Sequence, residues 1–260
     1  PYQLGETEVT WQIVDNSGNM IEVVQLVTVT NTDPIANAGL DQVLECTSQN
    51  GVELTLDATA SSDADPGDLL DYRWEAVDIT FDDPDSATPA ATFPHGSTTV
   101  QLTVTDQCGG SSTTDLLIIV EDTTSPQIQA ALVDRNVLWP PNHEMIPVAL
   151  DLLVSDLCSA PEDLIVICYV DSDESDDENG DGSSTGDVAG QDGHSQTVEI
   201  PLTYNAATER WQGDLELRAE RDGGGDGRKY SIRCVAADSS GNATMATVCV
   251  TVPKSKGKNK

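Results

Sequence analysis

Aromatic residues are scarce in this sequence. They make up 4% of its 260 residues, and only two of them are Phe. A core with so few rings must be built mainly on Val, Ile and Leu, and small cores usually need support from disulfides, metal ions or neighbouring domains. The length leaves room for about two domains of ordinary size.

Basic residues are also few. The chain has 12 Lys and Arg against 45 Asp and Glu, so its formal net charge is -33. A polyanion repels nucleic acids and anionic lipids, which excludes both as expected partners. It also repels itself unless cations neutralise part of the charge, and Ca²⁺ prefers carboxylate ligands. The alternative is that the acidity only keeps the chain soluble in a salty medium; we expect calcium because the acidic residues cluster at particular spacings.

Long apolar runs and catalytic motifs are missing. No run reaches the ~18 residues that a membrane span needs, and no signal peptide opens the chain. There is no Gly-x-Ser-x-Gly elbow, no His-Glu-x-x-His and no phosphate-binding loop, so we expect no catalytic residues. Because a strand pattern is already under way near Pro1, we expect the C-terminal part of a longer precursor that is secreted or displayed on a cell surface.

The dominant sequence period is two. Stretches such as Val9–Val14, Val100–Val104 and Thr247–Val252 alternate apolar and polar residues, which is typical of half-buried antiparallel strands. Clusters of Gly, Asn, Asp and Pro separate these stretches, and no segment has the pattern of an amphipathic helix. The sequence therefore predicts an all-β protein of tandem Ig-like antiparallel β-sandwiches.

A weak internal repeat sets the expected domain boundaries. Turn sequences at 15–19, 106–110 and 238–242 each precede a final apolar strand, which indicates modules in series. A hairpin alone is not stable, so the first segment must be the end of a further domain. We expect a C-terminal hairpin of an Ig-like domain at 1–33, a sandwich at 34–125, a second sandwich with an acidic loop insertion at 126–253, and a basic tail at 254–260.

The six cysteines are widely spread and form no Cys-x-x-Cys pair. An even number in an acidic, Thr-rich chain favours three disulfides and an oxidising compartment, with free buried thiols as the alternative. If the pairs form within domains, Cys46 joins Cys108. In the last domain we expect Cys168 to pair with Cys234, which leaves Cys158 for Cys249.

Several motifs between residues 34 and 125 resemble a PKD (polycystic kidney disease) domain. They are the run Ala36–Gln42, Leu56-Asp57-Ala58 followed by 61–65, Tyr72-Arg73-Trp74 and Val104-Thr105-Asp106. The resemblance implies a calcium ion at one end of the sandwich, because some PKD domains hold one there. The residues that it implies as ligands are Asn37, Asp63, Asp65 and Asp106, with Asp68 nearby. The alternative is that these side chains cap turns by accepting backbone N–H groups.

The terminal segments carry weaker resemblances. The opening hairpin resembles the last two strands of a hyalin-repeat (HYR) or related bacterial Ig-like domain, and the last domain resembles C-terminal Ig-like modules of bacterial surface proteins. The Asp-x-Ser-Gly-Asn turns and acidic joints resemble interdomain calcium sites of bacterial adhesins. That resemblance implies one ion held by Asp15 and Asn19 with the joint around Asp33, and a role for Asp122 at the next joint. A plain β-turn is the alternative.

The most acidic loop begins at Asp171 and Asp173. Within it Asp177, Asn179 and Asp181, followed by Gly182, match the first half of an EF-hand or thrombospondin type 3 loop. The match then fails, because Val188 stands where an EF-hand has its bidentate Glu. Asp187 is the nearest replacement, and Asp226 in a second acidic stretch is a further candidate ligand. A disordered acidic loop is the alternative.

These observations predict a non-catalytic, calcium-stabilised extracellular array that serves as a stalk, surface or fibre component of a bacterium. Its expected partners are other copies of itself or neighbouring surface proteins, and polysaccharide. The alternative is a carbohydrate-binding or spacer region of a secreted hydrolase, which solvent-exposed aromatic residues on one sheet face would favour.

Overall fold

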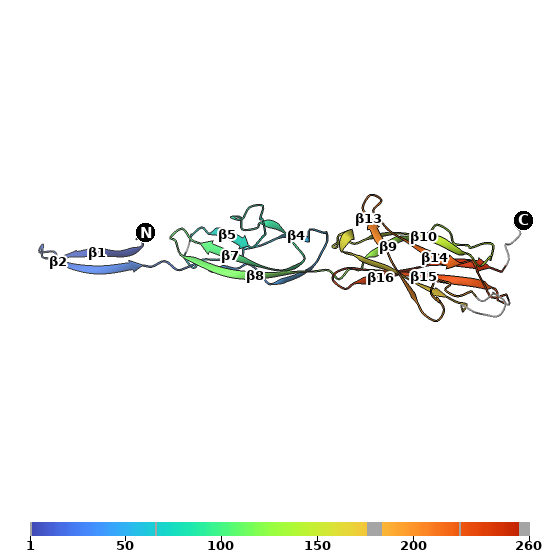
Figure 1. Cartoon of the computed structure of the whole chain (residues 1–260). Helices are drawn as coiled ribbons and strands as arrows, with labels where there is room; N and C mark the ends of the chain where they lie inside the picture. Colours follow the sequence, from blue (N-terminus) through green and yellow to red (C-terminus); the bar gives the residue numbers. More distant parts are fainter. Residues whose placement is uncertain (1, 66, 176–183, 224, 255–260) are drawn as a thin grey trace, which may run out of the picture. The chain divides into compact units, whose positions relative to one another are not determined.

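The computed structural model describes residues 2–65, 67–175, 184–223 and 225–254. Nearly all of its regular structure is strand, with a single short 3₁₀ helix, η1 (Pro161–Asp163), among the described residues. The predicted all-β class with tandem sandwiches is confirmed (Figure 1). The chain divides into two compact units: one comprises 1–45 and 50–121, the other 46–49 and 122–260. The described residues contain no helix long and apolar enough to span a membrane.

The first unit opens with a two-stranded antiparallel hairpin and continues with a sandwich. The hairpin pairs β1 (Gly5–Val14) with β2 (Met20–Val29). The sandwich has a four-stranded sheet in the order β3-β8-β7-β5 and a two-stranded sheet, β4-β6. The strands of this sandwich are β3 (Gln42–Glu45), β4 (Val52–Thr55), β5 (Asp71–Ala76), β6 (Ala90–Phe93), β7 (Gly96–Thr105) and β8 (Ser111–Glu121).

The core of this sandwich follows from the alternation read in the sequence. Every second residue of β7, Val100, Leu102 and Val104, is fully buried, and the residues between them face outward. Trp74 of β5 is 1% exposed, and its indole N–H donates to the carbonyl of Ser86 at 3.0 Å. The core of this sandwich is thus mainly aliphatic, with three buried aromatic side chains, Trp74, Phe81 and Phe93.

The second unit has two four-stranded sheets, ordered β13-β14-β10-β9 and β12-β11-β15-β16, around one hydrophobic core. Cys168 and Cys234 lie opposite one another on β11 and β15 and form the predicted disulfide. The strands are β9 (Gln127–Val133), β10 (Met145–Ser155), β11 (Ile165–Ser172), β12 (Val198–Pro201), β13 (Thr203–Asn205), β14 (Arg210–Arg218), β15 (Gly227–Ala237) and β16 (Ala243–Pro253).

The other predicted disulfides are wrong. Cys46 is bonded to Cys158, and Cys108 and Cys249 keep free thiols. The register of the strands gives the reason. β3 runs parallel to β8 with Glu45 opposite Glu121, so Cys46 lies where β8 ends.

Cys108, in contrast, lies in the turn before β8 begins. A strand of this length, at about 3.4 Å per residue, separates Cys46 from Cys108 by roughly 30 Å. Cys249 lies within β16 opposite Ser231, away from the loop that carries Cys158.

Candidate metal centre

The three repeat turns are each organised by their first aspartate. In the turn between β1 and β2, Asp15 Oδ1 accepts the N–H groups of Ser17 and Asn19 at 2.8 and 2.9 Å, and the Asn19 side chain donates to Asp15 Oδ2. In the turn between β15 and β16, Asp238 receives the backbone and side-chain N–H groups of Asn242 in the same way. These carboxylates therefore cap their own turns.

The middle turn differs because Gly110 stands where the other turns have Asn. Asp106 Oδ1 accepts the N–H groups of Cys108 and Gly110, whereas its Oδ2 accepts Nδ2 of Asn31 at 2.8 Å. Asn31 belongs to the segment that follows β2 and supplies the amide that the turn lacks. These hydrogen bonds, led by the one from Asn31, lower the pKa of Asp106 against the opposing effect of burial. Asp106 is consequently held as a buried carboxylate, 3% exposed.

Two further aspartates approach Asp106 at the same end of the sandwich, which we call the Asp106 pole. Asp63, Asp68 and Asp106 each offer an oxygen within 4.8 Å of the others. Oδ2 of Asp63 and Oδ2 of Asp68 are buried and have no hydrogen-bond partner. Burial, and then the negative charges of Asp63 and Asp106, raise the pKa of Asp68. A hard divalent cation fits this donor set, because it would bind the two unpartnered oxygens and relieve the repulsion.

The other residues implied at this pole have different roles. Asp65 lies beside the cluster, where its N–H donates to Asp63 Oδ1 at 2.6 Å and its Oδ2 accepts the N–H of Thr32 at 2.8 Å. Asn37 is exposed, and its Oδ1 accepts the N–H of Gly39, so it caps its own turn. The structure thus groups Asp63 and Asp106 with Asp68, and places Asp65 in support.

A second acidic group lies at the start of the second unit. Asp122, Asp156 and Cys158 offer ligand atoms within 4.8 Å of one another, although the Cys158 sulfur is in a disulfide and is no thiolate. Asp156 Oδ1 accepts the N–H groups of Cys158 and Ser159, while its Oδ2 is buried without a hydrogen-bond partner. Sequence reasoning named Asp122 and missed Asp156. Asp156 directly follows β10, as Asp106 directly follows β7.

The ion predicted between Asp15, Asn19 and the joint at Asp33 is contradicted. β1 and β2 pair along their full length from Val14–Met20 to Gly5–Val29, so the turn and the joint lie at opposite ends of the hairpin. Ten-residue strands separate those ends by roughly 30 Å. One ion cannot bind both.

In the described part of the acidic loop of the second unit, two of the candidate carboxylates form ion pairs with arginines. Asp171 Oδ2 pairs with Nη2 of Arg233 at 2.6 Å. Asp187 is 1% exposed and pairs with Nε of Arg218 at 3.1 Å and with the fully buried Arg228. Both carboxylates thus already have cationic partners.

The remaining candidates of this loop are not brought together with them. Asp173 Oδ1 accepts the N–H of Lys229 at 2.7 Å, and Asp226 is exposed. Asp177, Asn179 and Asp181 lie outside the described residues, so calcium in this loop stays a prediction.

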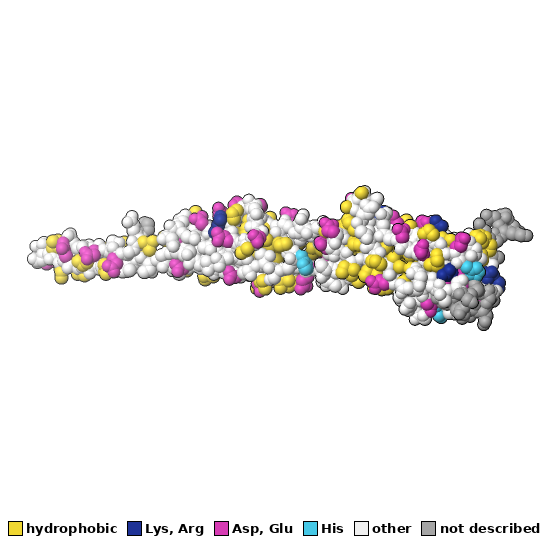
Figure 2. Space-filling model, viewed as in Figure 1, with side chains coloured by type: hydrophobic (Ala, Val, Ile, Leu, Met, Phe, Trp, Pro, Cys, Tyr) yellow, Lys and Arg dark blue, Asp and Glu magenta, His cyan; other side chains and the backbone are white. Residues whose placement is uncertain are grey.

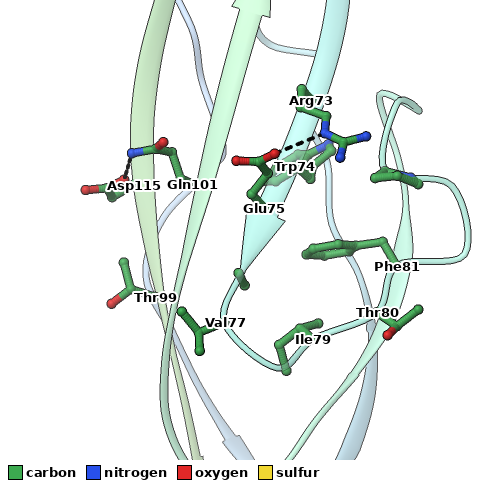
Figure 3. A pocket seen from close by; sticks show the side chains of 12 residues that line it. Arg73, Trp74, Glu75, Val77, Ile79, Thr80, Phe81, Thr99, Gln101 and Asp115 are labelled. Atoms are coloured by element: carbon green, nitrogen blue, oxygen red, sulfur yellow. Dashed lines mark hydrogen bonds and ion pairs between the residues drawn. The ribbon is translucent and has the colours of Figure 1, made fainter.

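A groove of about 760 Å³ lies beside β5 of the first sandwich (Figure 3). Arg73 and Glu75 form an ion pair of 3.3 Å at one side of it, and Gln101 donates to Asp115 at 3.2 Å at the other. Its two aromatic residues, Trp74 and Phe81, are 1% and 8% exposed. Neither ring is free to stack on a sugar, so the groove does not favour the carbohydrate-binding alternative.

Comparison with known proteins assigns the first sandwich. Residues 31–120 match the family model of the PKD domain, so this part of the chain is a PKD domain. The dyslexia-associated protein KIAA0319 homologs of Rattus norvegicus and Mus musculus are 34% and 30% identical over 155 and 210 residues, which is 55% and 76% of this chain. The chain spans only 14% and 18% of the length of these relatives.

A solved structure also matches part of the chain. The solution structure of the PKD domain from the KIAA 1837 protein is 24% identical, with a TM-score of 0.31, and the match covers 38% of this chain and 97% of that one. The curated relatives above come from rat and mouse, and they lend no support to the predicted bacterial surface protein with an HYR module.

Proposed function

We propose that this chain, with its PKD domain at residues 31–120, is a non-catalytic extracellular spacer of β-sandwich modules that binds calcium at the Asp106 pole. The observation that carries the proposal is the pair of buried, unpartnered oxygens of Asp63 and Asp68 beside the carboxylate of Asp106. Asp63, Asp68 and Asp106 would hold the ion, and backbone carbonyls and water would complete its shell.

The proposed role of the ion is structural. Asn31 and Thr32 of the segment before the sandwich donate to Asp106 and Asp65, so the pole also fixes the entry of the chain. A cation that compensates these carboxylates relieves their mutual repulsion, and so stabilises the pole to which the entering chain is attached. The group of Asp122 and Asp156, at the start of the second unit, offers two carboxylates and is the proposed second site.

The charge distribution supports an extracellular role. Acidic side chains are spread over the visible surface of both units, and basic ones are few (Figure 2). Such a surface disfavours nucleic acid and anionic membranes and suits a medium rich in divalent cations. The proposed partners are other copies of the chain, neighbouring surface proteins and polysaccharide, in a stalk, surface layer or fibre.

Thermal unfolding with and without free calcium tests the proposal. At free calcium about 1,000-fold above its dissociation constant, one bound ion stabilises the folded chain by about 4 kcal/mol, and a chelator removes this gain. Replacing both Asp63 and Asp68 by Asn removes the part of the calcium-dependent rise in Tm that comes from the Asp106 pole, and leaves only the part that comes from Asp122 and Asp156. The matched control is Asp115→Asn, an exposed acid of the same sandwich, which keeps the full rise. A wild-type Tm that does not respond to calcium would overturn the proposal.

A further inference from the structure

The hairpin β1–β2 has one mostly apolar face and one mixed face, which carries its glutamates together with Val14, Met20, Val24 and Leu26. Side chains alternate along each strand, and the register places Trp11 opposite Val23 and Ile13 opposite Ile21 on one face. The three glutamates of the two strands, Glu6, Glu8 and Glu22, all lie on the other face. The apolar face is nevertheless open: Trp11 is 53% exposed and Ile13 and Ile21 are both 60% exposed.

The same hairpin occurs twice more in the chain with its apolar face covered. Counting back from the turn aspartates Asp15 and Asp106, Trp11 and Ile13 occupy the positions of Leu102 and Val104. These two residues of β7 are completely buried. Each strand also starts at a glycine of positive φ, Gly5 at 97° and Gly96 at 113°. The hairpin β1–β2 is thus built as the closing hairpin of a sandwich.

The two complete sandwiches also show which neighbours this hairpin lacks. Leu102 of β7 lies opposite Trp74 of β5, and Cys234, the corresponding residue of β15, lies opposite Cys168 of β11. Among the described residues β1 has no such neighbour, because its sheet consists of β1 and β2 alone. A missing antiparallel strand therefore belongs beside β1, with an apolar residue opposite Trp11.

The outer edge of β2 lacks a neighbour as well. In the PKD domain β3 runs parallel to the end of β8, and in the second unit Val137 makes a parallel bridge to Thr251 of β16. The position corresponding to this bridge is Thr28 of β2. A short parallel strand belongs there.

We propose that β1–β2 closes a third sandwich whose remaining strands are supplied by a segment of the same protein N-terminal to Pro1. Chain order argues for that source, because the strands that cover β7–β8 and β15–β16 all precede them in sequence. A second copy of the hairpin offers two strands and lacks the antiparallel and parallel neighbours that both templates share. An edge left open in this way invites uncontrolled pairing, which natural sheets avoid by covering the edge.

Hydrogen exchange of the full-length protein encoded by its gene, compared with residues 1–260 alone, tests this assignment. In the full-length protein the amides of β1 and β2 exchange at least about 100-fold more slowly than in residues 1–260, because opening then requires unfolding of a sandwich. Ile13→Glu in the full-length protein removes this protection. The matched control Gln12→Glu, on the glutamate-bearing face of the same strand, retains it.

Two outcomes would overturn the assignment. One is a full-length protein in which β1 and β2 exchange as fast as in residues 1–260, or a gene that encodes no preceding segment. The other is protection of β1 in residues 1–260 alone that grows with protein concentration and accompanies a dimer in sedimentation equilibrium, because the cover is then a second copy. Neither outcome depends on calcium, so the test is independent of the proposed function.

Discussion

Nδ2 of Asn31 donates a hydrogen bond of 2.8 Å to Oδ2 of Asp106. In the turn between β15 and β16, the equivalent hydrogen bond to Asp238 comes from Asn242 of the turn itself. This hydrogen bond is possible because position 110 is Gly, whereas the other two turns have Asn at the equivalent position. A Cβ atom on Gly110 would lie 2.6 Å from the Asp106 carboxylate and 2.7 Å from Nδ2 of Asn31, too close for both to remain. Gly110 thus leaves room for the segment that contains Asn31 to contact the Asp106 pole.

Removal of this amide changes the titration of the pole. Asn31→Ala should raise the pKa of Asp106, since the Asn31 hydrogen bond is the largest influence that lowers it. Carbon-13 NMR of the labelled carboxylates measures this pKa. An Asp106 pKa that is the same in wild type and Asn31→Ala would contradict the account.

Calcium binding and stability should depend on pH through Asp68. Its pKa is raised in the folded chain above the ordinary value of 3.8, so between pH 3.8 and the folded pKa the metal-free folded state holds a proton that the unfolded state has lost. Asp68 therefore adds stability below pH 3.8, and this contribution is lost as the pH rises through its folded pKa. The pH dependence that comes from Asp106 has the opposite sign. Its lowered pKa contributes stability above pH 3.8, and this contribution is lost as the pH falls through the folded pKa of Asp106.

Because Ca²⁺ binds the ionised carboxylate, its affinity should weaken as the pH falls through the raised pKa of Asp68. Calorimetric titration with calcium at neutral and acidic pH measures this change. Asp68→Asn serves as the comparison, with weaker binding and a flatter pH dependence. Wild-type affinity that does not change over that range would show that Asp68 is not a ligand.

The free thiol of Cys108 should report on the ion. Burial, and then the charges of Asp68 and Asp106, raise the pKa of Cys108, so its thiolate is scarce at neutral pH although the residue is exposed. A cation at the pole offsets those charges, and the rate of Cys108 alkylation by iodoacetamide should increase several-fold on adding calcium. Cys249 is the internal control, since it lies within β16 opposite Ser231 and belongs to neither acidic group, so its rate should not change. Equal rates for Cys108 in calcium and in chelator would argue against a cation near it.

The second sandwich should be sensitive to loss of one buried charge. Arg228 is fully buried and pairs with Asp187, which is 1% exposed. Arg228→Met leaves a buried carboxylate without this cation and should lower the free energy of unfolding by about 3–5 kcal/mol, measured by urea denaturation. Arg233→Met is the control on the same strand. Its pair with Asp171 is partly exposed, so that loss should cost no more than about 1 kcal/mol.

The fold could be predicted from the sequence because alternation decides which side chains are buried. Val100, Leu102 and Val104 lie at every second position and all reach the core. The Cys168–Cys234 disulfide was also predictable, because both residues lie in the middle of alternating strands. The Cys46–Cys158 pairing was not, since it depends on the parallel register of β3 against β8, which brings Cys46 to the far end of the sandwich from Cys108.

The candidate site was predictable only in outline. Asp63 and Asp106 follow from the resemblance to PKD domains, but local sequence does not reveal that Asn37 caps its own turn or that Asp156 faces Asp122. The arginine partners of Asp171 and Asp187 are 62 and 31 residues away along the chain. Such ion pairs form only when the sheets assemble, so acidic sequence patterns alone overestimate the number of carboxylates that are available to bind a metal ion.

A crystal structure of the chain grown in calcium chloride tests the central claim most directly. The account predicts electron density for one ion within about 2.3–2.6 Å of Oδ2 of Asp63 and Oδ2 of Asp68, the distances typical of calcium–oxygen bonds, with Asp106 in its shell. Water alone at hydrogen-bonding distances from these carboxylates would contradict it.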